Sequence, residues 1–239
     1  QWRRMGVYAE KPEGADALLF NSYPFGAEWL FDEAFALKRR FPHMLIVYRL
    51  NGPISFIRGT DVEVDKMIAT FNQALCDGIV FQSSWCQNIN HEHFDISSAH
   101  ETVIHNAPDP TIFHLPTSPS SHLSTSPIKL IATSWSSNPR KGFDVYQFLD
   151  SHLDFDRYEM TFVGNSSLRF RRIRMIEPVS SRELADLLRT HDIFLTASQT
   201  DPCSNSLVEA LACGLPTVAL NDGGHPELVG NGGKLFEGT

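Results

Sequence analysis

Two kinds of segment alternate along most of this chain, and the alternation limits the possible folds more than any other feature. Short apolar runs rich in β-branched residues are followed by longer segments whose apolar residues have helical spacing. This order is typical of a parallel sheet wrapped by helices. The expected strands are residues 15–22, 43–50, 78–83, 101–106, 128–134, 159–165, 173–178, 193–198 and 217–221, and the expected helices are residues 26–41, 61–77, 142–153, 180–191 and a segment that follows residue 201.

One segment lacks both periodicities. Residues 114–127, with the sequence HLPTSPSSHLSTSP, are rich in Pro, Ser and Thr and cannot bury a core face. We therefore predict two domains, residues 1–115 and 128–239, joined by a linker over residues 116–127. The length of 239 residues and the hydrophobic fraction of 42% suffice for two cores.

The composition narrows the classes of partner. A formal net charge of -8 argues against binding to nucleic acid or to an anionic membrane, since both need a positive surface field. No apolar run approaches the roughly 18 residues that a membrane span requires, and no basic-then-apolar leader opens the chain. The four cysteines form no CxxC pair, which favours buried thiols in a reducing compartment. These features predict a cytoplasmic protein that binds small ligands.

Two carboxylates flank a predicted helix start in DPCSNSLVEALACGLP, residues 201–216. Each has a structural explanation, because Asp201 before Pro202 is a plausible N-cap, and Ser206 with Glu209 has the spacing of a capping box. The two explanations begin the helix at different residues, so both cannot be fully right.

A helix that begins near Ser204 gives a functional alternative. The backbone amides of Asn205, Ser206 and Leu207 would then be available to an anion at the positive end of the helix. The flanking carboxylates could accept hydrogen bonds from the neutral hydroxyl groups of a sugar or a ribose beside that anion.

A second candidate site is SWSSNPRKGFD, which follows the expected strand 128–134 and leads into a helix. Arg140 and Lys141 lie where a phosphate would meet backbone amides, and Lys141 is the predicted phosphate ligand. Ser136 and Ser137 could add hydroxyl donors. The alternative is a solvated basic pair in a loop.

Other motifs carry weaker signals. Gly164 lies at the end of an expected strand, and Gly223 and Gly224 follow another. They would allow a ligand to approach the backbone or would simply form tight turns. No GxGxxG fingerprint is present, so a nicotinamide cofactor is disfavoured. His91 and His93 are two residues apart, make a poor metal pair on a helix, and are better explained as a solvated helix end. The arginines of residues 169–174 could guide an anionic ligand but are better explained as a solvated edge.

Taken together, four stretches resemble the retaining glycosyltransferases of family 4: VIHNAPDPTIFH, NPRKGFDVY, LADLLRTHDIFLTASQTDPCSNSLVEALACGLPTVAL and GGHPELV. The third stretch is long and specific. The resemblance implies an α/β fold of the GT-B type, with two Rossmann-like domains whose parallel sheets face a cleft. It also implies that this chain is truncated at both ends relative to the family.

By this resemblance the C-terminal domain binds a nucleoside diphosphate sugar, and the N-terminal domain offers a glycan, lipid or small-molecule acceptor. Asp201 and Glu209 match two glutamates of the family, of which the first contacts the donor sugar and the second the ribose. Lys141 and the amides of Asn205, Ser206 and Leu207 would hold the diphosphate. Neither a metal nor another cofactor is expected.

Three positions depart from the family pattern. Asp201 is one methylene shorter than glutamate, and Ser136 stands where many members have an arginine. The loop that bears a catalytic histidine in many members has the sequence RLNGP here, so Asn51 or Arg49 is expected on the acceptor side.

The resulting prediction is glycosyl transfer with retention of anomeric configuration. The alternatives are an epimerase or phosphorylase of the same fold, or a non-catalytic binder of nucleotide sugars or glycans. The predicted catalytic residues are Asp201, Lys141 and Asn51, and the predicted binding residues are Glu209, Asn205, Ser206, Leu207, Arg140, Ser136, Gly164 and Arg49.

Overall fold

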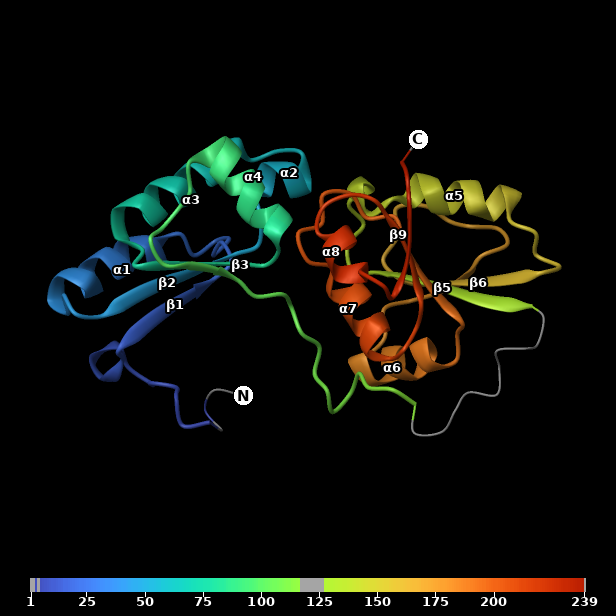
Figure 1. The fold of residues 1–239 in the computed structure, drawn as a ribbon, viewed down its shortest axis with the longest axis horizontal. Helices are drawn as coiled ribbons and strands as arrows, with labels where there is room; N and C mark the ends of the chain where they lie inside the picture. The colour runs from blue at the N-terminus through green and yellow to red at the C-terminus, as the bar shows by residue number, and fades with distance from the viewer. Residues whose placement is uncertain (1–2, 4, 117–126, 239) are drawn as a thin grey trace. The chain divides into compact units, whose positions relative to one another are not determined.

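The chain divides into two compact units, Gln1–His105 and Asn106–Thr239, in a computed structural model that describes residues 3, 5–116 and 127–238. Each unit has its own parallel sheet (Figure 1). Most of the predicted linker lies outside the described residues.

The first unit is a four-stranded sheet in the order β1-β2-β3-β4, with every described pairing parallel. Its residues alternate between buried and more exposed along β2, so one face carries most of the core. On that face the aromatic rings of Phe20, Phe31, Tyr48 and Phe71 pack together. The elements are β1 (Ala17–Asn21), α1 (Trp29–Arg40), β2 (Leu45–Leu50), α2 (Ile54–Arg58), α3 (Val62–Leu75), β3 (Gly78–Phe81), α4 (Ser84–Phe94) and β4 (Glu101–Val103).

The second unit is a six-stranded parallel sheet in the order β10-β9-β8-β5-β6-β7. Successive strands spread outward from β5 in opposite directions, so the order reverses between β5 and β8. The elements are β5 (Ile128–Ser134), α5 (Phe143–His152), β6 (Tyr158–Gly164), β7 (Arg174–Ile176), α6 (Ser181–Arg189), β8 (Ile193–Thr196), α7 (Asn205–Ala212), β9 (Thr217–Leu220), α8 (His225–Val229) and β10 (Gly233–Phe236).

Helices cover both faces of the second sheet, which explains the continuous apolar runs in its strands. Ile131 joins the core formed with α6 and α7, whereas its neighbours Leu130 and Ala132 join the core formed with α5. Figure 1 shows α5 and α6 on opposite sides of β5 and β6. The second unit is therefore a parallel sheet with helices on both of its faces.

The predicted alternation of strands and helices is present in both units. Ser180 and Glu183 form the capping box that their spacing predicts at the start of α6. The pattern gave no separate prediction for α2, α8 or β10, and for α4 it indicated only a helix end at His91 and His93. None of the four cysteines forms a disulfide. No helix among the described residues is long and apolar enough to cross a membrane.

Residues 106–116 belong to the second unit by their contacts, although the linker composition places the end of the first domain at residue 115. Phe113 is buried in the core formed with α6 and α7. Arg189 of α6 donates to the carbonyl oxygen of Ile112 at 2.5 Å. This segment therefore packs onto the second sheet before the chain enters it.

Candidate functional site

The strand order of the second unit places two loops together. The chain leaves β5 towards α5 on one face and leaves β8 towards α7 on the other, while β5 and β8 are neighbours in the sheet. In open α/β sheets, ligands bind outside the carboxyl ends of the strands at such a point. The loop after β5 carries Lys141, and the loop after β8 carries Asp201.

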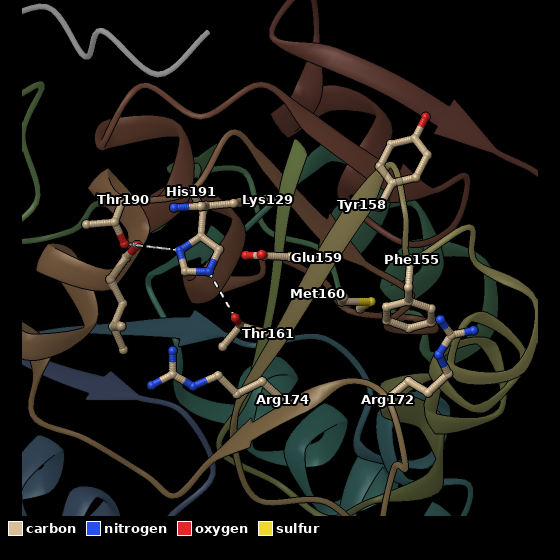
Figure 2. A pocket seen from close by; sticks show the side chains of 11 residues that line it. Lys129, Phe155, Tyr158, Glu159, Met160, Thr161, Arg172, Arg174, Thr190 and His191 are labelled. Carbon is tan, nitrogen blue, oxygen red and sulfur yellow. Dashed lines mark hydrogen bonds between the residues drawn. The ribbon is translucent and has the colours of Figure 1, made fainter. Parts of the chain in front are cut away.

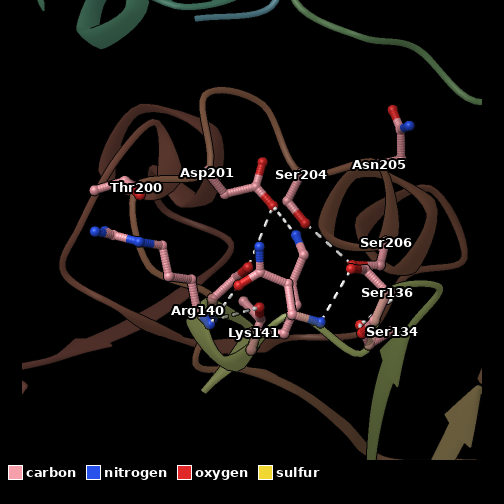
Figure 3. Close-up of polar contacts among 12 residues, drawn as sticks. Ser134, Ser136, Arg140, Lys141, Thr200, Asp201, Ser204, Asn205 and Ser206 are labelled. Atoms are coloured by element: carbon pink, nitrogen blue, oxygen red, sulfur yellow. Dashed lines mark hydrogen bonds and ion pairs between the residues drawn. The ribbon is translucent and has the colours of Figure 1, made fainter. Parts of the chain in front are cut away.

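Lys141 and Asp201 form an ion pair, with 3.0 Å between Nζ and Oδ2 (Figure 3). Their side chains are 31% and 12% exposed, so the pair is partly withdrawn from water. Ser198 Oγ lies 3.4 Å from the same carboxylate oxygen. Lys141 and Asp201 belong to two separate sequence motifs, sixty positions apart, and the fold brings their side chains into contact.

A glycine allows these two loops to touch. Gly142 has φ +75°, and a Cβ at this position would lie 2.3 Å from the carbonyl oxygen of Ala197. The same contact is strengthened by Gln199, whose N–H donates to the carbonyl oxygen of Arg140 at 2.7 Å. A residue with a side chain at position 142 would push Lys141 away from Asp201.

Asp201 is held by the loop that follows β9. Thr200 has φ +48°, which is strained for a β-branched residue, and its N–H donates to Asp222 Oδ2 at 2.8 Å. The carbonyl oxygen of Asp201 accepts from Gly224 N at 2.9 Å. A Cβ on Gly223 would lie 2.5 Å from that carbonyl oxygen. The close backbone approach accounts for glycine at position 223.

Helix α7 begins at Asn205 with Ser204 as its N-cap, and Ser204 makes no side-chain capping bond. Both structural explanations of the flanking acids are therefore wrong, because neither Asp201 nor a Ser206–Glu209 box caps this helix. The first intrahelical bond runs from Val208 N to the carbonyl oxygen of Ser204. The N–H groups of the first turn have no partner within the helix.

The three residues of that first turn differ in what they can offer. Leu207 is fully buried in the core, so only its N–H can serve a ligand. Ser206 Oγ lies 3.0 Å from Ser204 Oγ. Asn205 is exposed, and its Oδ1 accepts a hydrogen bond from Asn106 Nδ2 at 2.8 Å.

Glu209 lies more than one turn inside α7. Its Oε2 is buried and has no hydrogen-bond partner among the described residues. Burial raises the pKa of Glu209 to about 7. A buried polar atom without a partner costs free energy, so this carboxyl group is suited to a ligand that brings hydroxyl donors.

Of the remaining predicted residues of this unit, Ser136 and Arg140 lie in the loop after β5, and Gly164 lies at the end of β6. Ser136 Oγ accepts from Asn138 N at 3.1 Å, which leaves its own hydroxyl hydrogen as a donor. Arg140 turns its guanidinium group away from the Asp201 carboxylate (Figure 3). Gly164 has φ +115° at the end of β6, and a Cβ there would lie 2.0 Å from the carbonyl oxygen of Ser134. Glycine at position 164 therefore has a backbone explanation.

Asn51 and Arg49 lie in the first unit. Asn51 follows β2, and its amide joins two neighbouring strand ends, because Nδ2 donates to Ser22 Oγ at 2.5 Å and Oδ1 accepts from Gln82 Nε2. Ser22 itself has φ +77°. Arg49 is the penultimate residue of β2, and its Nη1 lies 3.4 Å from Asn21 Oδ1.

Two further residues of the site, His225 and Asn106, were not among the predicted site residues, although Asn106 matches a segment of the family pattern. His225, at the start of α8, is fully buried, and this burial lowers its pKa. Its Nδ1 donates to the carbonyl oxygen of Leu220, and its Nε2 has no hydrogen-bond partner among the described residues. Asn106 donates from Nδ2 to the carbonyl oxygen of Cys203 at 2.7 Å and so supports the start of α7. Both residues stand in stretches that resemble the family, GGHPELV and VIHNAPDPTIFH, but the sequence does not show which groups they contact.

The described part of the chain contains no group of three His, Cys, Asp or Glu side chains placed to hold a metal ion.

Residues 170–238 match the family model of the glycosyl transferases group 1. This range contains Asp201, α7 and the loop after β9. No curated protein matches the chain by sequence.

Solved structures match nearly the whole chain. Sucrose-phosphate synthase from Thermosynechococcus elongatus superposes with a TM-score of 0.72 at 14% identity, over 94% of this chain and 61% of that one. HepE from Anabaena, in complex with UDP-glucose, gives 0.71 at 20% identity, over 92% and 64%. A glycosyltransferase from Rickettsia africae gives 0.68 at 15% identity, over 99% and 64%.

These likenesses define the fold. The chain has the α/β architecture with parallel sheets of the GT-B glycosyltransferases, so the predicted fold class is confirmed. It spans 61–64% of the length of these three structures.

Proposed function

We infer that this protein transfers a sugar from a nucleoside diphosphate sugar to an acceptor hydroxyl group, with retention of configuration at the anomeric carbon. The observation that carries this inference is the Lys141–Asp201 ion pair at the switch point of the second sheet. Asp201 lies in the segment that leads to α7, whose N-cap makes no side-chain capping bond. The match of residues 170–238 to a glycosyltransferase model and the UDP-glucose complex of HepE support the same reading.

The diphosphate is assigned to Lys141 and the first turn of α7. An ammonium group has three N–H donors, so Lys141 can keep its bond to Asp201 while it donates to a phosphate oxygen. The N–H groups of Asn205, Ser206 and Leu207 add the positive end of the helix. Ser136 and Arg140, in the loop after β5, supply a further hydroxyl donor and a further cation. This set needs no metal ion to balance the phosphate charge.

The two acids are assigned to the hydroxyl groups on either side of the diphosphate. Asp201 would orient the donor sugar, and Glu209 would accept from the ribose. Burial of Glu209 Oε2 without a partner supports this role, because ribose hydroxyls would satisfy that oxygen.

Bond cleavage moves charge in two directions. As the bond to the leaving diphosphate breaks, the sugar ring gains oxocarbenium character and the diphosphate gains negative charge. Lys141 and the α7 amides stabilise the second charge, and each such donor contributes on the order of 3 kcal/mol to lowering the barrier. Asn51, whose amide is fixed by Ser22 and Gln82, and Arg49 are the groups proposed to meet the acceptor.

Two measurements test this proposal. A thermal-shift screen of nucleoside diphosphates and their sugars should find one donor that raises the melting temperature, because it binds only the folded state. With that donor and an acceptor panel, NMR of the product should show the anomeric configuration of the donor.

The alternatives predict different products from the same donor. An epimerase would change the sugar without an acceptor, and a phosphorylase would need phosphate. A binding protein would give a thermal shift with no product and no hydrolysis of the donor. Product with inverted configuration would contradict retention while leaving glycosyl transfer intact.

A further inference from the structure

A lined cavity lies at the end of the six-stranded sheet opposite the candidate donor site. It has a volume of about 280 Å³ and opens at the amino ends of β5 and β6, whereas Asp201 follows the carboxyl end of β8 (Figure 2). Residues from the end of α6 complete its wall. This cavity shares no residue with the candidate donor site.

Two cations share one face of the sheet at this cavity. Lys129 pairs in register with Glu159, and Arg174 pairs with Thr161, two residues further along β6. Residues two apart point to the same face of a strand, so these four side chains lie on one side. Figure 2 shows Lys129 and Arg174 on the same side of β6 as His191.

A third cation approaches from the other side of the strand. The Arg172 guanidinium group lies 4.0 Å from the centre of the Phe155 ring, and both residues line the cavity. None of the three cations forms an ion pair within the described ranges of the chain. Three cations therefore line this cavity against one carboxylate, that of Glu159, in a chain whose net charge is -8.

The base of the cavity is polar and uncharged. His191 Nδ1 donates to the carbonyl oxygen of Leu187 at 2.7 Å, and His191 Nε2 lies 3.0 Å from Thr161 Oγ1, so the neutral ring accepts from the threonine hydroxyl. Burial lowers the pKa of His191, which keeps the ring neutral. The Thr190 hydroxyl also donates to Leu187, so the last turn of α6 directs little uncompensated negative charge at the cavity.

We propose that this cavity binds the phosphate group of a small phosphate monoester, with Lys129 and Arg174 as the main donors. Lys129 is half-buried and forms no ion pair among the described residues, and a phosphate would give its ammonium group charge-assisted hydrogen bonds. The volume lies just below the range of about 300–1,000 Å³ for small-molecule pockets, so the organic part must be small. The proposal does not depend on the sugar-transfer reaction.

Calorimetric titration of the full chain tests the site, with inorganic phosphate and phenyl phosphate as probes at constant ionic strength. Arg174→Gln and Lys129→Gln should each weaken binding roughly tenfold, since each removes one charge-assisted bond. Glu159→Gln is the matched control, because it removes the only acid that lines the cavity and should strengthen binding. Both cations lie near the surface, and unchanged melting temperatures would confirm that the variants fold.

The donor site provides the second control. Lys141→Met removes a proposed phosphate ligand of the donor site, so binding of the probes at the cavity should persist in this variant. The amide chemical shifts of Thr161 and His191 should still move when phosphate is added. If Lys141→Met abolishes binding, the probes occupy the donor site and the cavity proposal fails. Equal affinity in the wild-type chain and both glutamine variants, or no binding, would also overturn it.

Discussion

At the scale of single residues, Lys141 has two partners in the proposed donor complex, Asp201 and a phosphate oxygen. We expect Lys141→Met to lower kcat/KM by roughly 100-fold or more, the usual effect of removing one preorganised donor from a transition state. It should also lower the melting temperature, because the Asp201 side chain is only 12% exposed and loses its cation. Steady-state kinetics and thermal melting measure the two effects.

The double variant Lys141→Met with Asp201→Asn separates folding from catalysis. Removing both charges should restore much of the melting temperature but none of the activity. Lys234→Met, at an exposed lysine of β10, is the control and should change neither quantity. Activity that recovered together with stability would show that Lys141 acts only on the fold.

Glu209 gives a pH dependence at the same scale. Its pKa is about 7 in the free protein, because burial disfavours the charged form. Ribose hydroxyls donate best to the carboxylate, so donor affinity should rise with pH up to about 7 and level off above it, approaching a tenfold change per pH unit on the acidic side. Calorimetric titration with a nucleoside diphosphate sugar at pH values from about 5.5 to about 8.5 covers the titration of Glu209 and measures how donor affinity depends on pH.

Glu209→Gln should bind the donor more weakly and show no such pH dependence, because glutamine does not titrate. The same carboxyl group affects stability in the opposite direction. Its pKa is raised on folding, so its contribution to stability is present at acid pH and is lost as the pH rises through about 7. A wild-type affinity that stayed constant across this range would remove Glu209 from the ribose site.

At the scale of elements, Gly142 decides whether the loops after β5 and β8 can meet. We expect Gly142→Ala to destabilise the protein and to reduce donor binding, since its Cβ would lie 2.3 Å from the carbonyl oxygen of Ala197. Gly26 is the matched control, because it has the same φ of +75° and no atom within 4 Å of an added Cβ. Both variants incur the left-handed strain of about 1–2 kcal/mol, and only Gly142→Ala adds the clash.

Thermal melting and donor titration distinguish the two variants. Gly26→Ala should lower stability modestly and leave donor affinity unchanged. Equal effects of both substitutions on affinity would show that the contact between Gly142 and Ala197 does not position Lys141.

The same scale shows what the sequence could predict. Capping chemistry placed the start of α6 at Ser180, because the box is formed by residues three apart. The start of α7 was left open among three alternatives, since Asp201, Ser204 and Ser206 can all cap a helix. Contacts from Asn106 to Cys203 and Asn205 support the observed start, and such long-range contacts leave no local pattern.

Short elements escaped prediction for a different reason. Helices α2 and α8 have five residues each, too few to show a helical period. Helix α4 has the polar sequence SWCQNINHEHF, which gives little amphipathic contrast. The orphaned oxygen of Glu209 is likewise a product of packing, which a single sequence does not reveal.

At the scale of the whole molecule, the composition predicts two domains but does not indicate that the second compact unit begins at Asn106. A Pro- and Ser-rich run indicates a segment that cannot contribute to a hydrophobic core. Such a run does not predict that Phe113, just before it, packs in the core formed with α6 and α7. The segment before the run therefore belongs with the sheet that follows it.

This division predicts which part of the molecule a donor orders first. The residues assigned to the diphosphate all lie in the unit Asn106–Thr239. Amide hydrogen exchange should therefore slow in residues 136–142 and 201–209 when a nucleoside diphosphate is added, while residues 17–105 exchange as before, because local opening is suppressed only where the ligand binds. Lys141→Met should reduce this protection. Protection confined to residues 17–105 would place the diphosphate in the first unit and contradict the assignment of the donor to α7.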